Sequence, residues 1–426
     1  MSKGCKMLPR KIFKELEKQM KDRKISFLIG PRQVGKTTLL KALFEEAAKT
    51  NNCIFIDLDI ITNYEKVSTF ENLVNTLKLN GYKENQKTFT YLFLDEFQRY
   101  PKLALIMKNV YDNLTNVKIY ASGSSSILIK DQVQESLAGR KKINEIYPLD
   151  FEEVLWFKGN KKLIEAFINS RKLNGDELNK VLKELNELLK EFLIFGGYPE
   201  VVLKEKKEEK IGVLESIFDL YVKKDLVDYM KIEKILNMKK LIEVLAVNNA
   251  QKIKYEEISH ATSLSFLEIK EYIEILKETY LIQILKPFYT NKNKELVKIP
   301  KVYFMDNGVR NYFIKNFNEL SLRNDAGFLF ESFIIMELLK KKVKELKFWQ
   351  GKNGEEVDII IDNISYQIPI EVKFKSNLKN EDFSGINTYL KEYPKTKKTY
   401  LVNLSAQKTI KKIHLLLPYC INKVKA

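Results

Sequence analysis

The chain has 426 residues, too many for a single hydrophobic core, and two or three domains are expected. Its residues are 45% hydrophobic and 30% charged, and no run approaches the roughly 18 apolar residues of a membrane helix, which excludes a membrane-spanning class and predicts a globular protein. The net charge of +17 suits nucleic acid. However, only eight of the 73 basic residues are arginine, and a Lys- and Glu-rich chain also accompanies thermal adaptation or a biased genome. Charge alone therefore does not establish a DNA partner.

The N-terminal segment and the cysteines bear on the cellular compartment. The first 24 residues have no long apolar core and no small-residue cleavage site, so we do not expect them to be a secretory signal. Cys5, Cys53 and Cys420 lie far apart and lack metal-ligand spacing, which indicates ordinary reduced thiols. We therefore expect a cytoplasmic protein with no membrane partner.

The first expected elements are a short apolar strand over 25–29 and a helix over 38–44, joined by a glycine-bracketed turn. This turn fits the pattern G-x-x-x-x-G-K-[ST] completely, with Gly30, Pro31, Arg32, Gln33, Val34, Gly35, Lys36 and Thr37. In such a turn the main-chain N–H groups cradle phosphate oxygens at the start of the helix. Lys36 would reach the β and γ phosphates, and the Thr37 hydroxyl would ligate Mg²⁺. Together with Thr38, these residues form the predicted ATP site, although we expect Arg32 to contact neighbouring backbone rather than phosphate.

The next expected strand, 91–94, is apolar throughout and ends in Asp95 and Glu96. Four apolar residues in a row are typical of a strand that is buried on both faces of a parallel sheet. At its end, Asp95 would hold Mg²⁺ through water, as in P-loop enzymes. Glu96 would polarise the attacking water, and a glutamate in this place predicts hydrolysis rather than binding alone.

Two further stretches fit the same site. A strand over 117–126 ends in hydroxyl side chains, and we expect Ser124, or alternatively Ser122, to sense the γ phosphate. Arg140 follows and is a candidate arginine finger, in its own subunit or in a neighbour's. An arginine finger that acts on the site of a neighbouring subunit would require a homo-oligomer. The competing interpretation of Arg140 is a surface or interdomain salt bridge.

Several of these stretches are similar to a known family. The sequences GPRQVGKTT, YLFLDEFQ, ASGSSS and LAGR…YPLDFEEVL, followed by FGGYPEVV at 195–202, resemble the AAA-type ATPases of archaea and bacteria. The chain resembles in particular those members that carry an uncharacterised C-terminal domain related to PD-(D/E)xK nucleases. The resemblance spans nearly the whole chain and implies an ATPase fold followed by a nuclease-like one. It does not settle the cellular role.

The middle of the chain is predicted to be mostly helical. Amphipathic helices are expected over 160–192 and 207–247, interrupted by the turn Phe195–Pro199, and they resemble the lid of an ATPase core or form an exposed spacer. A helix from 255, a turn at 261–263, a helix over 266–278 and strands at 281–285 and 301–305 follow, the order of a winged helix with a Lys-rich wing at 289–298. Such a module contacts DNA or docks on protein. His260 near its turn is expected to cap or pack, and with two histidines in the chain we expect no histidine-based zinc or base chemistry.

The last expected part contains a second group of polar residues. A strongly apolar helix over 327–339 carries Glu331, and Asp358 lies on a strand over 356–361 that follows a strand at 348–350 and a turn at 351–354. In the next strand, 367–374, alternation puts Glu371 and Lys373 on one face. This is the D…E-x-K arrangement of many nucleases. Asp358 and Glu371 would hold Mg²⁺, Lys373 would orient or activate a metal-bound water, and Glu331 would complete the metal shell. Gln367 is a weaker candidate, and a chance E-x-K in a Lys/Glu-rich chain is the competing interpretation.

The expected fold class is therefore α/β. We expect a P-loop AAA-type ATPase core with a doubly wound parallel sheet over 1–155. A helical lid over 156–247, a winged helix over 248–315 and a restriction-endonuclease-like α/β domain over 316–426 would follow. The expected function is Mg²⁺-dependent ATP hydrolysis coupled to action on DNA. A nucleotide-switched regulatory or scaffolding protein with an inactive nuclease fold is the alternative, and a protein-remodelling ATPase is a third.

Overall fold

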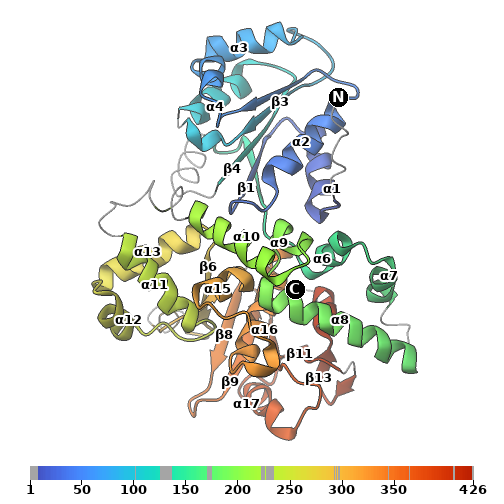
Figure 1. Ribbon diagram of the computed structural model, residues 1–426, viewed down its shortest axis with the longest axis vertical. Coiled ribbons are helices and arrows are strands. Elements are labelled where there is room, and N and C mark those ends of the chain that lie inside the picture. Colours follow the sequence, from blue (N-terminus) through green and yellow to red (C-terminus); the bar gives the residue numbers. More distant parts are fainter. Residues whose placement is uncertain are drawn as a thin grey trace. The chain divides into compact units, whose positions relative to one another are not determined.

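The computed structural model describes residues 8–100, 102–124, 137–169, 175–221, 226, 235–291, 293, 295, 298–343, 345–363, 365–405 and 408–424 (Figure 1). The chain divides into two compact units. The N-terminal unit comprises Met1–Tyr147, Leu220–Asp228 and Glu278–Tyr280, and the C-terminal unit comprises Pro148–Asp219, Tyr229–Lys277 and Leu281–Ala426. In the described part of the chain, no helix is long and apolar enough to cross a membrane.

The N-terminal unit is a parallel sheet with helices between its strands. Its strands are β1 (Ile25–Gly30), β2 (Cys53–Asp57), β3 (Thr90–Asp95), β4 (Val117–Ser124) and β5 (Lys141–Glu145), and its helices are α1 (Lys11–Lys18), α2 (Lys36–Ala47), α3 (Phe70–Leu79) and α4 (Leu103–Asn113). The strand order among the described residues is β2-β3-β4-β1-β5, and all neighbours are parallel. Strands β1, β3 and β4 are buried along their whole length, and for β1 and β3 their apolar runs predicted this burial. Ser125 and Ser126, expected to extend the fourth strand, lie outside the described residues.

The register of this sheet brings the predicted nucleotide residues to one edge. Gly30 at the end of β1 lies opposite Ser124 at the end of β4. Asp95 at the end of β3 lies opposite Asp57 at the end of β2. Because all of these strands run in the same direction, their carboxyl ends form a common edge, where doubly wound sheets bind ligands.

The C-terminal unit contains the helices α6 (Phe151–Lys158), α7 (Lys161–Asn169), α8 (Gly175–Phe195), α9 (Pro199–Leu203), α10 (Lys207–Leu220), α11 (Ile235–Val247), α12 (Tyr255–Thr262), α13 (Phe266–Glu278), α15 (Asn307–Phe313), α16 (Ala326–Lys340) and α17 (Ser384–Glu392). The last residues of α10 and α13 are assigned to the N-terminal unit. The strands of the C-terminal unit are β6 (Ile282–Pro287), β7 (Lys301–Phe304), β8 (Leu346–Gln350), β9 (Glu356–Asp362), β10 (Gln367–Val372), β11 (Thr399–Val402), β12 (Thr409–Ile410) and β13 (Ile413–Leu416).

The strands of the C-terminal unit form one mixed sheet in the order β12-β13-β11-β10-β9-β8-β6-β7 within the described residues. Strands β8, β9 and β10 are antiparallel neighbours, whereas β11 is parallel to β10. One core cluster of this sheet gathers Trp349, Val357 and Leu401 with Ile386 and Tyr389 of α17. Burial of these large apolar side chains fixes the positions of β9 and β10, on which the second group of predicted site residues lies.

The helices and strands expected for a winged helix are present in the expected order, but their surroundings differ from the expectation. Strand β6 pairs with β7 and also runs parallel to β8, so the hairpin belongs to the large sheet. In the Lys-rich segment expected as a wing, Glu295 is buried and pairs with Lys347 at 2.6 Å. The described residues of the expected lid, winged helix and nuclease-like part therefore belong to one compact unit, apart from residues 220–221, 226 and 278–280.

The double-glycine turn before α9 packs against the start of α15. Asp306 accepts hydrogen bonds from the N–H groups of Gly197 at 2.7 Å and Val309 at 3.1 Å, so it holds the turn and caps the helix at once. A Cβ atom added to Gly308 would lie 2.0 Å from the carbonyl oxygen of Phe195. The glycines of this segment thus permit a close approach of two backbones, which is a structural role.

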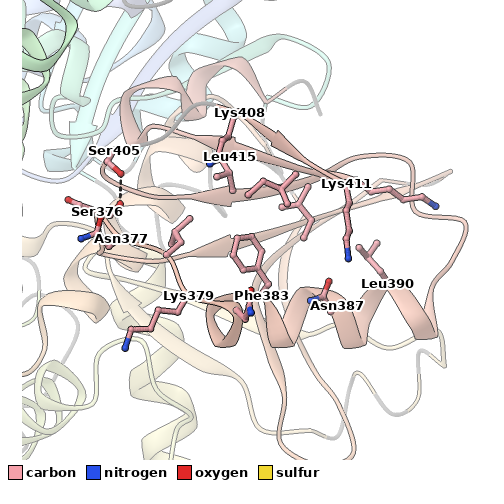
Figure 2. Close-up of a pocket in the computed structure, with 15 residues that line it drawn as sticks. Ser376, Asn377, Lys379, Phe383, Asn387, Leu390, Ser405, Lys408, Lys411 and Leu415 are labelled. Carbon is pink, nitrogen blue, oxygen red and sulfur yellow. Dashed lines mark hydrogen bonds between the residues drawn. The ribbon is translucent and has the colours of Figure 1, made fainter. Parts of the chain in front are cut away.

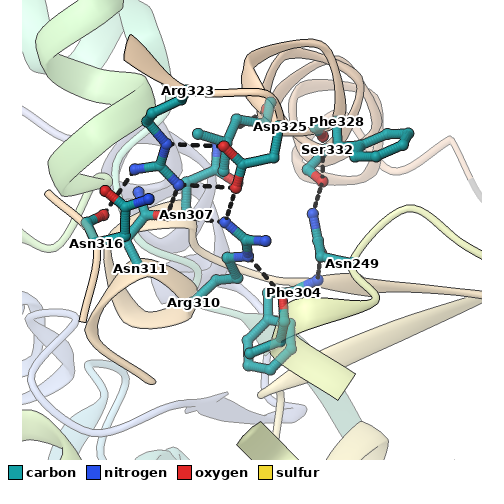
Figure 3. Close-up of polar contacts among 12 residues, drawn as sticks. Asn249, Phe304, Asn307, Arg310, Asn311, Asn316, Arg323, Asp325, Phe328 and Ser332 are labelled. Carbon is teal, nitrogen blue, oxygen red and sulfur yellow. Dashed lines mark hydrogen bonds and ion pairs between the residues drawn. The ribbon is translucent and has the colours of Figure 1, made fainter. Parts of the chain in front are cut away.

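A buried polar network ties α15 to the start of α16 (Figure 3). The Arg323 Nε donates to Asp325 at 2.8 Å, and Arg310 pairs with the same carboxylate. The Arg310 Nε also donates to the carbonyl oxygen of Ala246 in α11 at 2.7 Å. Burial would raise the pKa of Asp325, but the two guanidinium groups lower it to about 2. Removal of this carboxylate would leave two buried arginines without their anion.

Candidate nucleotide site and acidic cluster

The predicted phosphate-binding loop has the conformation that its glycines indicate. Gly35 caps α2 in the left-handed region with φ of 94°, so the chain turns sharply into the helix at Lys36. A Cβ atom on Gly30 would lie 2.0 Å from the carbonyl oxygen of Ile146. The loop backbone therefore passes close to a neighbouring segment, and any side chain at residue 30 would displace it.

Lys36 and an unexpected arginine hold the loop. The buried Lys36 Nζ donates to the carbonyl oxygens of Gly30 at 2.9 Å and Pro31 at 2.6 Å. Arg10 donates to the carbonyl oxygens of Val34 at 2.8 Å and Tyr147 at 2.9 Å. Arg10 was not predicted from the sequence, because no motif marks it and its role depends on a contact over 24 residues.

Asp95 lies beside the two hydroxyl side chains predicted to share its site. It is buried and accepts hydrogen bonds from Ser122 Oγ and from the Thr37 hydroxyl. Burial raises the pKa of the Asp95 carboxyl, and these two hydrogen bonds oppose the rise. A carboxylate next to a threonine hydroxyl is an oxygen donor set suited to Mg²⁺, which proteins often hold by only one or two carboxylates.

Gln98, which was not among the predicted site residues, holds Glu96 beside Ser124. Glu96 has a left-handed backbone with φ of 55°. Gln98 donates from its Nε2 to the Glu96 carboxylate and to Ser124 Oγ, the latter at 3.1 Å. The sequence signal for Gln98 was its place two residues after the acidic pair in DEFQ. Ser122 contacts Asp95 and Ser124 contacts Gln98, so both candidate sensors lie at this edge.

Arg140 lies at the opposite edge of the sheet. Its carbonyl oxygen accepts from the N–H of Ile25, at the start of β1, whereas the loop follows the end of that strand. Six residues of strand separate the two places, about 20 Å at roughly 3.3 Å per residue. The Arg140 side chain forms an exposed salt bridge with Asp112 at 2.6 Å. This position contradicts an arginine finger acting in its own subunit, because the side chain cannot span the sheet.

The four residues predicted for the second site come together in the C-terminal unit. The Lys373 Nζ donates to Glu371 at 2.5 Å, and Asp358 accepts from the N–H of Val372 at 2.7 Å. Glu331 lies on α16, Asp358 on β9 and Glu371 on β10, and Lys373 follows β10 directly. The charge of Asp358 affects the pKa values of the other three, which places all four in one electrostatic cluster. Gln367 lies apart, because it donates to Asp362 at 3.0 Å.

Three further residues complete this acidic cluster. Tyr303 donates to Glu331 at 2.5 Å, and the buried Lys301 lies 3.7 Å from Glu331 and pairs with Glu356. Lys301 and Tyr303 were not predicted to join this cluster, because they lie on β7, within the range expected to form a separate winged helix. Their alternation in the stretch KVYF, which puts both side chains on one face, was the available signal.

Burial dominates the electrostatics of the cluster. It raises the pKa of Glu371 well above its ordinary value, and it raises the pKa of Asp358 despite the nearby Lys373 and Lys301. Burial alone would lower the pKa of Lys373, but Asp358 and Glu371 raise it. The buried Glu371 Oε2 accepts no hydrogen bond among the described residues, which leaves one oxygen for a ligand or a proton. In the same part of the chain, no group of three or more His, Cys, Asp or Glu side chains is arranged to hold a metal ion.

We expect the Glu331→Gln variant to become more stable relative to the parent protein as the pH rises from 5 to 8. Burial raises the pKa of Glu331 to about 7, against an ordinary value of 4.5. A carboxyl group whose pKa is raised by folding stabilises the folded state fully when the pH lies below its pKa in the unfolded state. This stabilisation is lost as the pH rises through its pKa in the folded state. Glutamine does not ionise and escapes this loss. Thermal unfolding midpoints of both proteins across this pH range measure the difference.

Asp325→Asn is the matched control, because the pKa of Asp325 is lowered to about 2. Its stabilising charge is fully present above the ordinary pKa and is lost only as the pH falls through about 2. The variant should therefore be destabilised by a constant amount between pH 5 and 8. A Glu331→Gln difference that is equally flat would contradict an ionisation near neutral pH.

Comparisons with known proteins support an AAA-type domain in the N-terminal part of the chain. Residues 22–155 match a family described as an AAA domain, whereas residues 186–320 and 326–420 each match a domain of unknown function, DUF8612 and DUF4143. Uncharacterized protein MJ1544 of Methanocaldococcus jannaschii is 28% identical over 87% of this chain and 79% of its own length. An uncharacterised protein of Haemophilus influenzae is 24% identical over 89% of this chain and 91% of its own.

Among solved structures, the Walker-type ATPase paby2304 of Pyrococcus abyssi is similar, with 16% identity and a TM-score of 0.48 over 72% of this chain and 96% of that one. The free Cys53 and Cys420 agree with the expected reduced thiols, and Cys5 lies outside the described residues. The AAA match over residues 22–155, which contain the complete phosphate-binding loop, supports an ATPase enzyme of the AAA type.

Proposed function

We propose that the chain is a Mg²⁺-dependent ATPase whose site is the loop Gly30–Thr37 with Asp95 and Glu96. The observation that carries this proposal is the hydrogen-bonded group of Asp95, Thr37 and Ser122 at the carboxyl edge of the sheet. Asp95 and Thr37 would hold Mg²⁺, which supplies positive charge to the phosphates. The N-terminus of α2 and the loop N–H groups favour the polyphosphate. Lys36 would exchange its loop carbonyl partners for phosphate oxygens.

Glu96 is the proposed general base. Its carboxylate would take a proton from the attacking water, and Gln98 would hold it in place. Ser124, which shares Gln98 with Glu96, would report the presence of the γ phosphate to the base. Loss of the γ phosphate would then change one hydrogen bond at the end of β4.

Arg140 is proposed to act only on the site of a second copy of the chain. Its distance along β1 from its own loop and its exposure support this arrangement. Such an arrangement requires a homo-oligomer, and the Asp112 salt bridge would open when the copies meet. Because this salt bridge is solvent-exposed, it contributes little to stability and opens easily.

The work of the ATPase is proposed to be action on DNA through the acidic cluster. The support is that Asp358, Glu371 and Lys373 converge, with one Glu371 oxygen unpartnered among the described residues. Two carboxylates suit a Mg²⁺ ion that keeps waters and phosphates as its other ligands. Helices α12 and α13 with the hairpin β6–β7 are proposed to be a winged helix. The exposed Phe266 and Leu267 on α13 favour protein docking by this module.

The Asp358→Asn variant is expected to lose metal-dependent cleavage of linear or branched DNA while ATP turnover persists. Asparagine keeps the size of the side chain but removes the charge that a metal requires. The measurement is gel analysis of DNA with Mg²⁺ or Mn²⁺, beside phosphate release with and without DNA. Glu392→Gln, an exposed carboxylate on α17, is the matched control and should cleave normally. Cleavage by neither the parent protein nor the control, across a broad DNA panel, would favour the alternative of a nucleotide-switched scaffold with an inactive nuclease fold.

A further inference from the structure

A groove lies beside the acidic cluster, between α17 and the hairpin β12–β13 (Figure 2). Its volume of about 980 Å³ is at the upper end for a ligand site. One wall comes from the 3₁₀ helix η8 (Asn380–Phe383) and α17, and the other from residues 408–415. The groove is open along one side, so it suits an extended ligand rather than an enclosed one.

The rim of the groove is basic. Lys379, Lys408, Lys411 and Lys412 line it, and its lining contains no acidic residue. All four side chains are exposed, and Lys411 and Lys412 form the tip of the hairpin. Among the described residues, Lys408, Lys411 and Lys412 have no ion pair, and Lys379 has only a contact of 4.0 Å with Glu381. The ammonium groups of the other three lysines, without an ion pair among the described residues, are arranged here to meet an anionic ligand.

The floor of the groove is apolar. Phe383, Leu390 and Leu415 line it, and the amide of Asn387 is the polar group between them (Figure 2). A duplex would present only phosphates and would leave this floor uncovered. A single strand presents both phosphates and unstacked bases, and bases stack favourably on an aromatic side chain such as Phe383. Basic rim and apolar floor together match single-stranded nucleic acid.

The groove is joined to the acidic cluster by a short, hydrogen-bonded segment. The N–H of Lys373 donates to Val402 at 2.9 Å, and that of Leu404 donates to Lys375 at 3.0 Å. Ser376, three residues after Lys373, opens the groove, and Ser405 Oγ donates to its carbonyl oxygen (Figure 2). A nucleic-acid strand bound in the groove would therefore reach the side of the sheet on which Glu371 and Lys373 lie.

We propose that this groove binds single-stranded nucleic acid, with phosphates on the hairpin lysines and bases over the apolar floor, and leads the strand to the acidic cluster. The binding step stands independently, whereas the delivery step rests on the proposed function of that cluster. The ligand class follows from charge complementarity and the mixed lining. An acidic peptide would use the rim but would leave the apolar floor without a partner.

The test uses the full chain with EDTA and no nucleotide, so that neither catalytic site acts. Fluorescence anisotropy measures the affinity for a labelled 20-nucleotide single strand, a duplex of equal length and a polyglutamate peptide. Lys411→Glu/Lys412→Glu should weaken single-strand binding at least tenfold. The slope of log K against log salt should become shallower by about 1.4, since each neutralised phosphate contributes about 0.7. Lys206→Glu/Lys207→Glu, an exposed lysine pair before and at the start of α10, makes the same charge change and should alter affinity less than twofold.

Each result bears on the groove. Equal losses in both double variants, or no loss in the hairpin variant, would overturn the proposal, as would tighter binding of duplex or polyglutamate. Thermal melting of both variants excludes misfolding as the cause of a loss. If the hairpin variant loses binding while the parent protein cleaves no DNA, the groove stands and the nuclease proposal fails. If Asp358→Asn abolishes cleavage while the hairpin variant binds normally, the nuclease proposal stands and the groove proposal fails.

Discussion

Replacing Glu96 by glutamine is expected to lower the rate of ATP hydrolysis about 10²–10⁴-fold and to leave ATP binding intact. Glutamine keeps the shape of the side chain and its contact with Gln98, but it cannot accept a proton from water. The groups proposed to bind phosphate and Mg²⁺, namely the loop, Lys36, Thr37 and Asp95, remain unchanged. Phosphate release measures turnover, and the fluorescence of a labelled ATP analogue measures binding.

Two variants make this experiment specific. Asp59→Asn removes a carboxylate that pairs with Arg99 at 2.9 Å near the same sheet edge, and it should hydrolyse ATP within twofold of the parent rate. Lys36→Ala should lose binding together with turnover, because its ammonium group faces the loop. Turnover in Glu96→Gln above about one tenth of the parent rate would show that another group activates the water.

Gly308→Ala is expected to destabilise the C-terminal unit by about 1–3 kcal/mol or more. The added methyl group would lie 2.0 Å from the carbonyl oxygen of Phe195, and 2.4 Å from its carbon. Neither atom belongs to a flexible side chain, so the double-glycine turn or α15 must shift. That shift would disturb the hydrogen bond from Gly197 to Asp306. Thermal melting and urea unfolding measure the loss.

Gly212→Ala is the matched control within a helix. Nothing lies within 4 Å of a Cβ atom at residue 212, in the middle of α10. Alanine there should stabilise the protein by roughly 0.5–1 kcal/mol, because glycine loses more backbone freedom on helix formation. A Gly308→Ala variant as stable as the control would mean that the two backbones are not in contact in solution.

Local sequence patterns were sufficient for most of the elements that carry the two sites. The strand before Gly30, the strand ending at Asp95 and the helix bearing Glu331 were predicted within one or two residues. In each case the apolar period or run is itself the physical cause of the element, because burial of those side chains stabilises it. The phosphate-binding loop was predictable because its glycines encode its backbone conformation directly.

The sequence by itself therefore determined the nucleotide loop, the elements around it and the residue types of the acidic cluster. Only the tertiary structure decided which distant residues meet. It placed Arg140 across the sheet from the loop, brought Arg10 to Val34, and added Lys301 and Tyr303 to Glu331 by joining β6 to β8. The reason is physical: periodicity reports which face of an element is buried, whereas strand order and register depend on packing between segments far apart in the chain.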